Sequence, residues 1–455
     1  MPGNQTIIRP RQPSGSAPAG LGARGGTMVR AEAAASGLDS LVFSVGPALL
    51  RSIEFRKAGG AQQTEVLDEL RGFEHRATRG GVLREQVDAV RGLLFAVLEG
   101  DVARGAAQIG RLAEDPKAGP DLLEALYHCA CVGFAGEPAL EPLEHGLFAR
   151  LSMHRDFPAD APSAIRPGNA AGFPALGPRV TARSVVLAPL VLTARAFDRL
   201  RSRAAPVFAV LGSSGSGKSS LLGCIGAGSG AECVFIEASG PPRNAAQLVG
   251  EDMRSQLCGV VVTLDITDLL DPSGAPRPAG VQSVRQQMRD LDALAGAHLP
   301  VYLVLTKADR IPGFEEYFAG LDDSGRRQLW GVTFDLRDSH SGRALRTLPV
   351  TFDAMIARLN CGLTRRFTEE RRPLYRQRLY AFPRCVAALK TEVLAQVEQL
   401  VGAVPGTTHL FLRGVYVTSS GAGESGCGWF IDGLARDVLL PEKALFRRGR
   451  WHLKW

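Results

Sequence analysis

The segment LGSSGSGKSS, residues 211–220, has the residue types and spacing of a phosphate-binding loop. Its glycines let backbone N–H groups point inward, and a helix after the loop would add the positive end of its dipole. The pattern GxxxxGK[ST] between a strand and a helix is among the more specific short motifs. Lys218 would contact the β- and γ-phosphates of ATP or GTP, and the Ser219 hydroxyl would hold Mg²⁺. The predicted nucleotide-binding residues of the loop are Gly212, Ser213, Ser214, Gly215, Ser216, Gly217, Lys218, Ser219 and Ser220.

A second motif, Thr306-Lys307-Ala308-Asp309, follows the apolar run PVYLVL. In GTPases a tetrad of this kind reads the base: the lysine stem lies along the ring, and the carboxylate accepts two donors that guanine presents. The chain has only seven lysines against 46 arginines, yet Lys218 and Lys307 both lie in nucleotide-type motifs. A lysine retained against such a bias indicates that its compact charge matters. We therefore expect Thr306, Lys307 and Asp309 to contact the nucleotide.

Hydrolysis also needs an acid that holds the metal and a group that orients water. Glu237 stands where a hydrolase would have the aspartate of Asp-x-x-Gly, and its extra methylene shifts the carboxylate in a reaction that depends on positioning. Asp265 ends the run GVVVTLD, which resembles a Walker B strand, and is the other candidate metal ligand. Lys218 and Glu237 are thus the candidate catalytic residues. Either acid is also compatible with an ordinary surface position at a strand end.

Short apolar runs alternate with helical patterns around these motifs, and they predict the elements that position them. Buried strands joined by helices are typical of a doubly wound parallel sheet. We therefore expect an α/β fold of the P-loop NTPase type, with a mostly parallel sheet and helices on both faces. The expected strands are 206–212, 233–238, 259–266, 300–309 and 409–420, with helices at 183–203, 280–297 and 430–440.

Composition shifts divide the chain further. Apolar residues spaced three and four apart predict helices before and after the α/β part, and a Pro/Gly/Ala-rich stretch separates the first helical part from it. The predicted organisation is a disordered tail at 1–30, an all-α domain at 31–157, a linker at 158–182, the NTPase-like domain at 183–349, a helical extension at 350–445 and a basic tail at 446–455.

Charge and cysteine content limit the classes of function. The net charge of +7 comes from arginines interleaved with acids, which does not favour nucleic-acid binding. None of the eight cysteines forms a CxxC pair, which favours reduced thiols in a cytosolic protein over a metal site. No apolar stretch has the length of a membrane span. We expect a cytoplasmic protein whose basic tail is either solvated or in contact with an anionic membrane surface.

Longer stretches carry a family resemblance. The loop alone looks like that of an ABC-type ATPase, but the chain has no LSGGQ-like signature. Residues 298–334 closely resemble the NTPase region of the IcmF/TssM family, the inner-membrane component of bacterial type VI secretion. Their sequence is HLPVYLVLTKADRIPGFEEYFAGLDDSGRRQLWGVTF. Further segments resemble the same family and occur in the same order, so that the resemblance covers roughly residues 205–445. These segments are 258–270, 358–389 with its Phe-Pro, 412–420 and 430–445.

The resemblance implies a soluble component of a type VI secretion apparatus whose partners are other secretion components, at the inner membrane or the baseplate. It also implies a cytoplasmic location, peripheral at the inner membrane. The chain departs from the family pattern by lacking the usual transmembrane helices and by having Glu237-Ala-Ser-Gly240 where the family has Asp-Thr-Ala-Gly. The resemblance therefore supports nucleotide binding with Mg²⁺ more directly than it supports hydrolysis of the nucleotide.

Two alternatives stay open from the residues. One is a free-standing regulatory GTPase, with the tetrad at 306–309 selecting guanine and Glu237 or Asp265 in the metal role. The other is a pseudo-NTPase scaffold whose helical N-terminal half is the working surface. In the preferred interpretation the bound nucleotide serves assembly of the secretion complex, and any hydrolysis of ATP or GTP is slow.

Overall fold

The computed structural model describes most of the helical and α/β parts of the chain. The segments predicted as the N-terminal tail, the linker, the helix at 183–203 and the basic tail at 446–455 lie outside the described residues. The structure describes residues 40–59, 63–115, 118–154, 206–228, 234–237, 256–270, 278–296, 298–403, 410–421 and 428–442.

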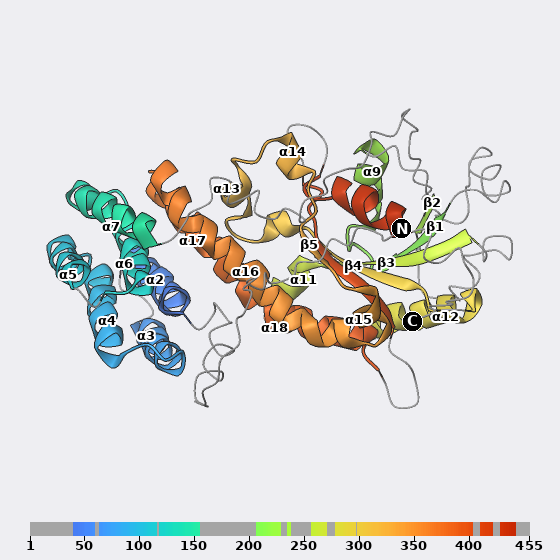
Figure 1. Cartoon of the computed structure of the whole chain (residues 1–455), viewed down its shortest axis with the longest axis horizontal. Coiled ribbons are helices and arrows are strands. Elements are labelled where there is room, and N and C mark those ends of the chain that lie inside the picture. Colours follow the sequence, from blue (N-terminus) through green and yellow to red (C-terminus); the bar gives the residue numbers. More distant parts are fainter. Residues whose placement is uncertain are drawn as a thin grey trace, which may run out of the picture.

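The N-terminal part is a bundle of helices, seen in blue to teal in Figure 1. Helix α2 contacts α3, α4 and α6 in this bundle. The helices end and begin where the sequence provides caps: Gly100 adopts a left-handed conformation (φ 71°) after α4, and the Asp101 carboxylate accepts from the backbone N–H of Arg104 at 2.9 Å to start α5. The elements are α2 (Leu41–Lys57), α3 (Gln63–Arg79), α4 (Arg84–Glu99), α5 (Val102–Glu114), α6 (Pro120–His128), the π-helical turn η3 (Cys129–Gly133), the 3₁₀ turn η4 (Pro138–Leu140) and α7 (Glu141–His154).

A six-stranded sheet forms the other part of the molecule, with the strand order β2-β1-β3-β4-β6-β5. All neighbouring strands are parallel except β5, which runs antiparallel to β6. This confirms the expected mixed α/β architecture with a mostly parallel sheet. The strands are β1 (Val207–Gly212), β2 (Val234–Glu237), β3 (Leu257–Asp265), β4 (Pro300–Thr306), β5 (Gly331–Thr333) and β6 (Phe411–Val417).

Helices cover both faces of this sheet because strand side chains alternate between the two sides. Phe208 and Val210 of β1 join one apolar cluster with helix α9 (Lys218–Gly228) and the π-helical segment η7 (Leu434–Leu439). Ala209 and Leu211 of the same strand join the other cluster, together with α12 (Pro278–Ala295). Because β1, β3, β4 and β6 are parallel neighbours, their carboxyl ends lie together at one edge of the sheet.

Long helices connect the bundle and the sheet, as the orange ribbons of Figure 1 show. Helix α17 contacts α2 and η3 of the bundle, while α18 contacts α12 and α16 contacts β6. Strand β6 follows these helices in the chain and lies within the segment expected as a helical extension. It forms an interior strand of the sheet, between β4 and β5. The remaining elements are α11 (Ile266–Leu270), η6 (Ala308–Arg310), α13 (Phe314–Phe318), α14 (Asp323–Arg326), α15 (Leu336–His340), α16 (Arg343–Glu369), α17 (Pro373–Ala388) and α18 (Lys390–Val401).

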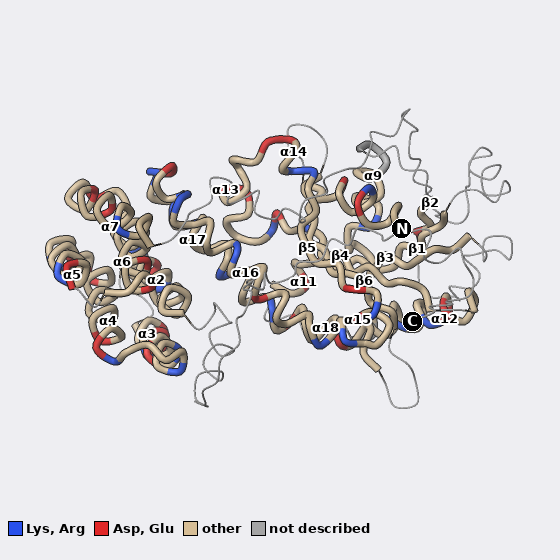
Figure 2. The backbone as a smooth tube through the Cα atoms, viewed as in Figure 1, with Lys and Arg blue, Asp and Glu red and all other residues tan. Residues whose placement is uncertain are grey.

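Charged residues of both signs are spread over the described helices. Figure 2 shows basic and acidic positions interleaved along helices of both the bundle and the α/β part. Within the described ranges, no helix is both long enough and apolar enough to cross a bilayer.

Candidate functional site

The glycine-rich loop joins the end of β1 to the start of α9, as its sequence predicts. Gly215 and Gly217 have φ values of 81° and 80°, which L side chains rarely adopt. Gly212 is restricted by space: a Cβ atom there would lie 2.3 Å from Oγ1 of Thr263 and 2.8 Å from its carbonyl oxygen. Ser216 is buried, whereas Ser213, Ser214 and Ser220 are exposed. One side of the loop therefore faces solvent, and the other side packs so closely against β3 that position 212 admits no residue larger than glycine.

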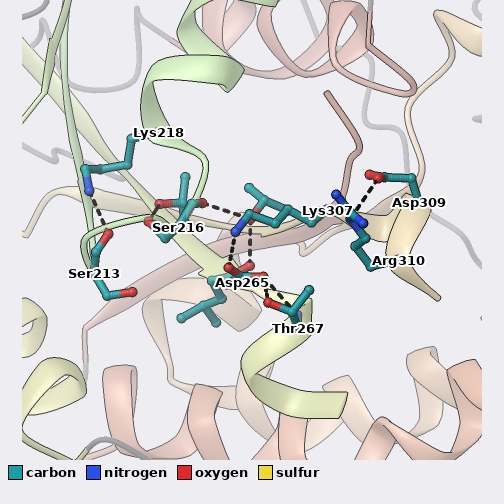
Figure 3. Close-up of polar contacts among 11 residues, drawn as sticks. Ser213, Ser216, Lys218, Asp265, Thr267, Lys307, Asp309 and Arg310 are labelled. Carbon is teal, nitrogen blue, oxygen red and sulfur yellow. Dashed lines mark hydrogen bonds and ion pairs between the residues drawn. The ribbon is translucent and has the colours of Figure 1, made fainter. Parts of the chain in front are cut away.

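Lys218 folds back onto this loop. Its ammonium donates to the backbone carbonyl oxygens of Gly212 at 3.1 Å and Ser213 at 2.8 Å. Figure 3 shows the bond to Ser213. The residue is buried (7% exposed), and burial lowers its pKa, although the nearby carboxylate of Glu237 opposes that change. A positive charge with incomplete hydration next to glycine N–H groups suits an anion.

Ser219 and Glu237 contact each other across the start of α9 and the end of β2. The Ser219 hydroxyl donates to Glu237 at 3.1 Å from Oε1 and 3.0 Å from Oε2. Glu237 is 5% exposed and therefore lies inside the site. A hydroxyl and a carboxylate are the hard oxygen ligands that Mg²⁺ prefers. The oxygens of these two side chains therefore suit a Mg²⁺ ion.

Asp265, the other candidate acid, has different partners. Its Oδ1 accepts from the backbone N–H of Thr267 at 2.9 Å and from the Thr267 hydroxyl at 2.7 Å, and its Oδ2 forms an ion pair with Lys307. Burial raises the pKa of Asp265, but the hydrogen bonds from Lys307 and Thr267 outweigh it, so the pKa lies below its ordinary value. The structure thus brings Glu237 to Ser219 and brings Asp265 to Lys307.

The tetrad at 306–309 lies beside the loop, after β4. The Thr306 hydroxyl donates to the carbonyl oxygen of Ser216 at 2.9 Å, which joins the tetrad directly to the glycine-rich loop. Lys307 has a left-handed backbone (φ 60°), unusual for a residue other than glycine. Asp309 accepts a hydrogen bond from the Ser419 hydroxyl, and its Oδ2 lies 3.6 Å from Nε of Arg310.

Two further residues belong to this site and were not identified from the sequence. Thr263 of β3 shares a hydrogen bond of 2.6 Å with the Ser216 hydroxyl beneath the loop. Ser419 reaches Asp309 from the segment after β6. The polar residues that end the strand expected at 409–420, Thr418-Ser419-Ser420, are a usable signal, because the carboxyl ends of parallel strands share one edge of a sheet.

Comparisons with known proteins give a consistent family relationship. Residues 253–455 match the IcmF-related N-terminal domain family. A type VI secretion system component, TssM1 of Pseudomonas aeruginosa strain PAO1, is 32% identical over 196 residues, which make up 43% of this chain and 18% of that protein. The match therefore spans less than a fifth of that relative's length. No solved structure matches the chain. The family match begins after the glycine-rich loop and includes Asp265, the tetrad at 306–309 and Ser419.

Proposed function

Because residues 253–455 belong to the IcmF/TssM family, we propose that this protein is a component of a type VI secretion system that binds ATP or GTP with Mg²⁺ at residues 212–220. The observation that carries the nucleotide site is the position of Lys218, whose buried ammonium lies against the carbonyls of the glycine-rich loop. Its partners would be other type VI components, and its working location the cytoplasmic side of the inner membrane.

Each residue of the loop would have a distinct part in binding. Lys218 would leave the carbonyls of Gly212 and Ser213 to neutralise phosphate charge, and the glycine N–H groups would donate to phosphate oxygens. Ser219 and Glu237 would hold Mg²⁺, which when bound neutralises charge between the β- and γ-phosphates. The remaining loop serines would line the approach to the phosphates.

The nucleotide state would serve assembly of the secretion complex. A ligand shifts a conformational equilibrium only through different affinities for the two states, so the γ-phosphate must contact a group that moves. Glu237 would respond to the γ-phosphate through the Mg²⁺ ion, because its bonds to Ser219 would have to change when Mg²⁺ enters. Hydrolysis would be slow, since the longer glutamate positions the metal less strictly than aspartate does.

Two carboxylate-to-amide variants test whether Glu237 or Asp265 is the acid that holds Mg²⁺. Glu237→Gln should lower Mg²⁺ affinity or any Mg²⁺-dependent turnover by about 10–100-fold, the usual cost of losing a group that supports a metal. Asp265→Asn is the matched control, because Asp265 is engaged by Lys307 and Thr267 and should leave both quantities within about threefold of wild type. Titration of Mg²⁺ at a fixed nucleotide concentration measures the effect, and a larger loss in Asp265→Asn would assign the metal to Asp265 instead.

Secretion in the producing bacterium tests the cellular role. A strain lacking the gene should release no type VI substrates into the medium, and the wild-type gene should restore release. The Lys57→Ala gene should restore it equally, because Lys57 is an exposed lysine of α2 that bonds Gln377. The Lys218→Ala gene should fail. Undiminished release without the gene would refute the secretion role, and full rescue by Lys218→Ala would refute a role for the nucleotide in it.

A further inference from the structure

Three buried hydroxyl groups lie beneath the glycine-rich loop. They belong to Ser216 of the loop, to Thr263 of β3 and to Thr306 at the end of β4, and these residues are 1%, 1% and 5% exposed. A buried hydroxyl that loses its hydrogen bond cannot replace it with a bond to water, so the loss costs free energy. The bonds among these three groups therefore constrain the loop that lies on them.

The hydroxyl of Thr263 holds the side chain of Ser216. Thr263 donates to the carbonyl oxygen of Leu211 at 3.2 Å, and its Oγ1 lies 2.6 Å from Oγ of Ser216. Because a hydroxyl has one proton to donate, Ser216 is the donor in this second bond. Gly212 packs against both groups, since a Cβ atom there would lie 2.3 Å from Oγ1 of Thr263 and 2.6 Å from Oγ of Ser216. The Ser216 side chain is therefore fixed on the inner side of the loop.

The peptide bond between Ser216 and Gly217 is oriented from the same inner side. The carbonyl oxygen of Ser216 accepts from the Thr306 hydroxyl at 2.9 Å, and a Cβ atom at Gly217 would lie 3.3 Å from that of Thr306. In a trans peptide the carbonyl and the N–H that follows it point in opposite directions. The N–H of Gly217 therefore points away from Thr306 and toward the outer side of the loop, where Ser213 and Ser214 are exposed.

A concave set of backbone N–H groups binds an anion only if these groups point toward it. Thr263 fixes the side chain of Ser216 and Thr306 fixes its carbonyl, so the peptide that carries the Gly217 N–H is held from two strands. We propose that Thr263 is a positioning residue of the phosphate site, which acts through Ser216 to keep the Gly217 N–H aimed at a bound triphosphate. Thr263 lies outside both nucleotide-type motifs of the sequence, and this role rests on the proposed nucleotide site.

Equilibrium titration of the full chain with ATP and with GTP in Mg²⁺ tests the role of Thr263. Thr263→Val keeps a similar shape and removes the hydroxyl, so it should bind both nucleotides about 10-fold more weakly, the equivalent of one buried hydrogen bond. Thr263→Ser keeps the hydroxyl and should stay within about threefold of wild type. Thr333→Val is the matched control, because Thr333 shares a hydroxyl–hydroxyl bond of 2.8 Å with Tyr416 on β5, the edge strand far from β1, and should leave affinity unchanged.

A double-mutant cycle tests whether Thr263 acts through Ser216. Ser216→Ala should also weaken binding about 10-fold, because it removes the other partner of the same bond. The variant that combines Thr263→Val with Ser216→Ala should lose about 10-fold in total, whereas two independent effects would multiply to about 100-fold. A multiplied loss would overturn the action of Thr263 through Ser216.

The remaining outcomes separate the positioning role from the nucleotide site itself. Affinity of Thr263→Val within about threefold of wild type, no rescue by Thr263→Ser, or an equal loss in Thr333→Val would overturn the positioning role and leave the proposed nucleotide site standing. Binding of neither nucleotide by wild type would overturn both.

Discussion

Lys218→Ala should bind both ATP and GTP at least about 100-fold more weakly than wild type, which corresponds to about 3 kcal/mol for charged hydrogen bonds to two phosphates. The structure allows this loss without unfolding, because the bonds of Lys218 within the described residues go to two loop carbonyls, one of them on the exposed Ser213. Water can replace the ammonium at those carbonyls. Calorimetric titration with each nucleotide in Mg²⁺ measures the change.

A matched lysine controls for the general loss of positive charge. Lys57→Ala removes the same charge from the N-terminal bundle and should leave nucleotide affinity unchanged. Both variants should unfold at the wild-type temperature in the absence of nucleotide. An affinity for ATP and GTP that survives Lys218→Ala within about threefold would mean that the loop is not the phosphate site.

Arg376→Ala should lower the free energy of unfolding by about 3 kcal/mol, the lower end of the cost of breaking a buried ion pair. The guanidinium of Arg376 lies 3.0 Å and 3.1 Å from the carboxylate oxygens of Glu144, and it also donates to the carbonyl of Phe367 at 2.9 Å. These bonds join α7 of the bundle to α16 and α17. The Arg376 and Glu144 side chains are 8% and 13% exposed, so the variant leaves a mostly buried carboxylate without its partner.

An exposed ion pair within the same bundle provides the comparison. Arg71 and Asp68 are 3.0 Å apart with side chains 77% and 62% exposed, and Arg71→Ala should cost less than about 1 kcal/mol. Urea unfolding monitored by circular dichroism measures both variants. Equal stabilities for Arg376→Ala and Arg71→Ala would show that the junction between the bundle and the long helices contributes little to folding.

Local patterns in the sequence predicted most of the sheet. Buried apolar runs lead directly into the glycine loop, into Asp265 and into the tetrad, so each strand and the loop after it could be located without tertiary information. Strand β5 was missed because three residues, Gly331–Thr333, are too short to show a periodic pattern. Its antiparallel direction depends on pairing with β6, which lies far along the chain.

The candidate site depended more strongly on long-range pairing. The sequence left both Glu237 and Asp265 as candidate acids, because both end a strand. Their partners follow from strand order: β2 lies directly beside β1 and brings Glu237 to Ser219, while β3 lies beside β4 and brings Asp265 to Lys307. Ser419 depended on the same long-range information: its polar neighbourhood at a strand end marks it as a candidate, but its contact with Asp309 follows only from the pairing of β6 with β4.

The most direct test of a nucleotide-binding type VI component is the titration of the wild-type chain with GTP and with ATP in the presence of Mg²⁺. We expect saturable binding of one nucleotide per chain, with affinity reduced when Mg²⁺ is chelated. Absence of saturable binding by either nucleotide at millimolar concentration would contradict the account.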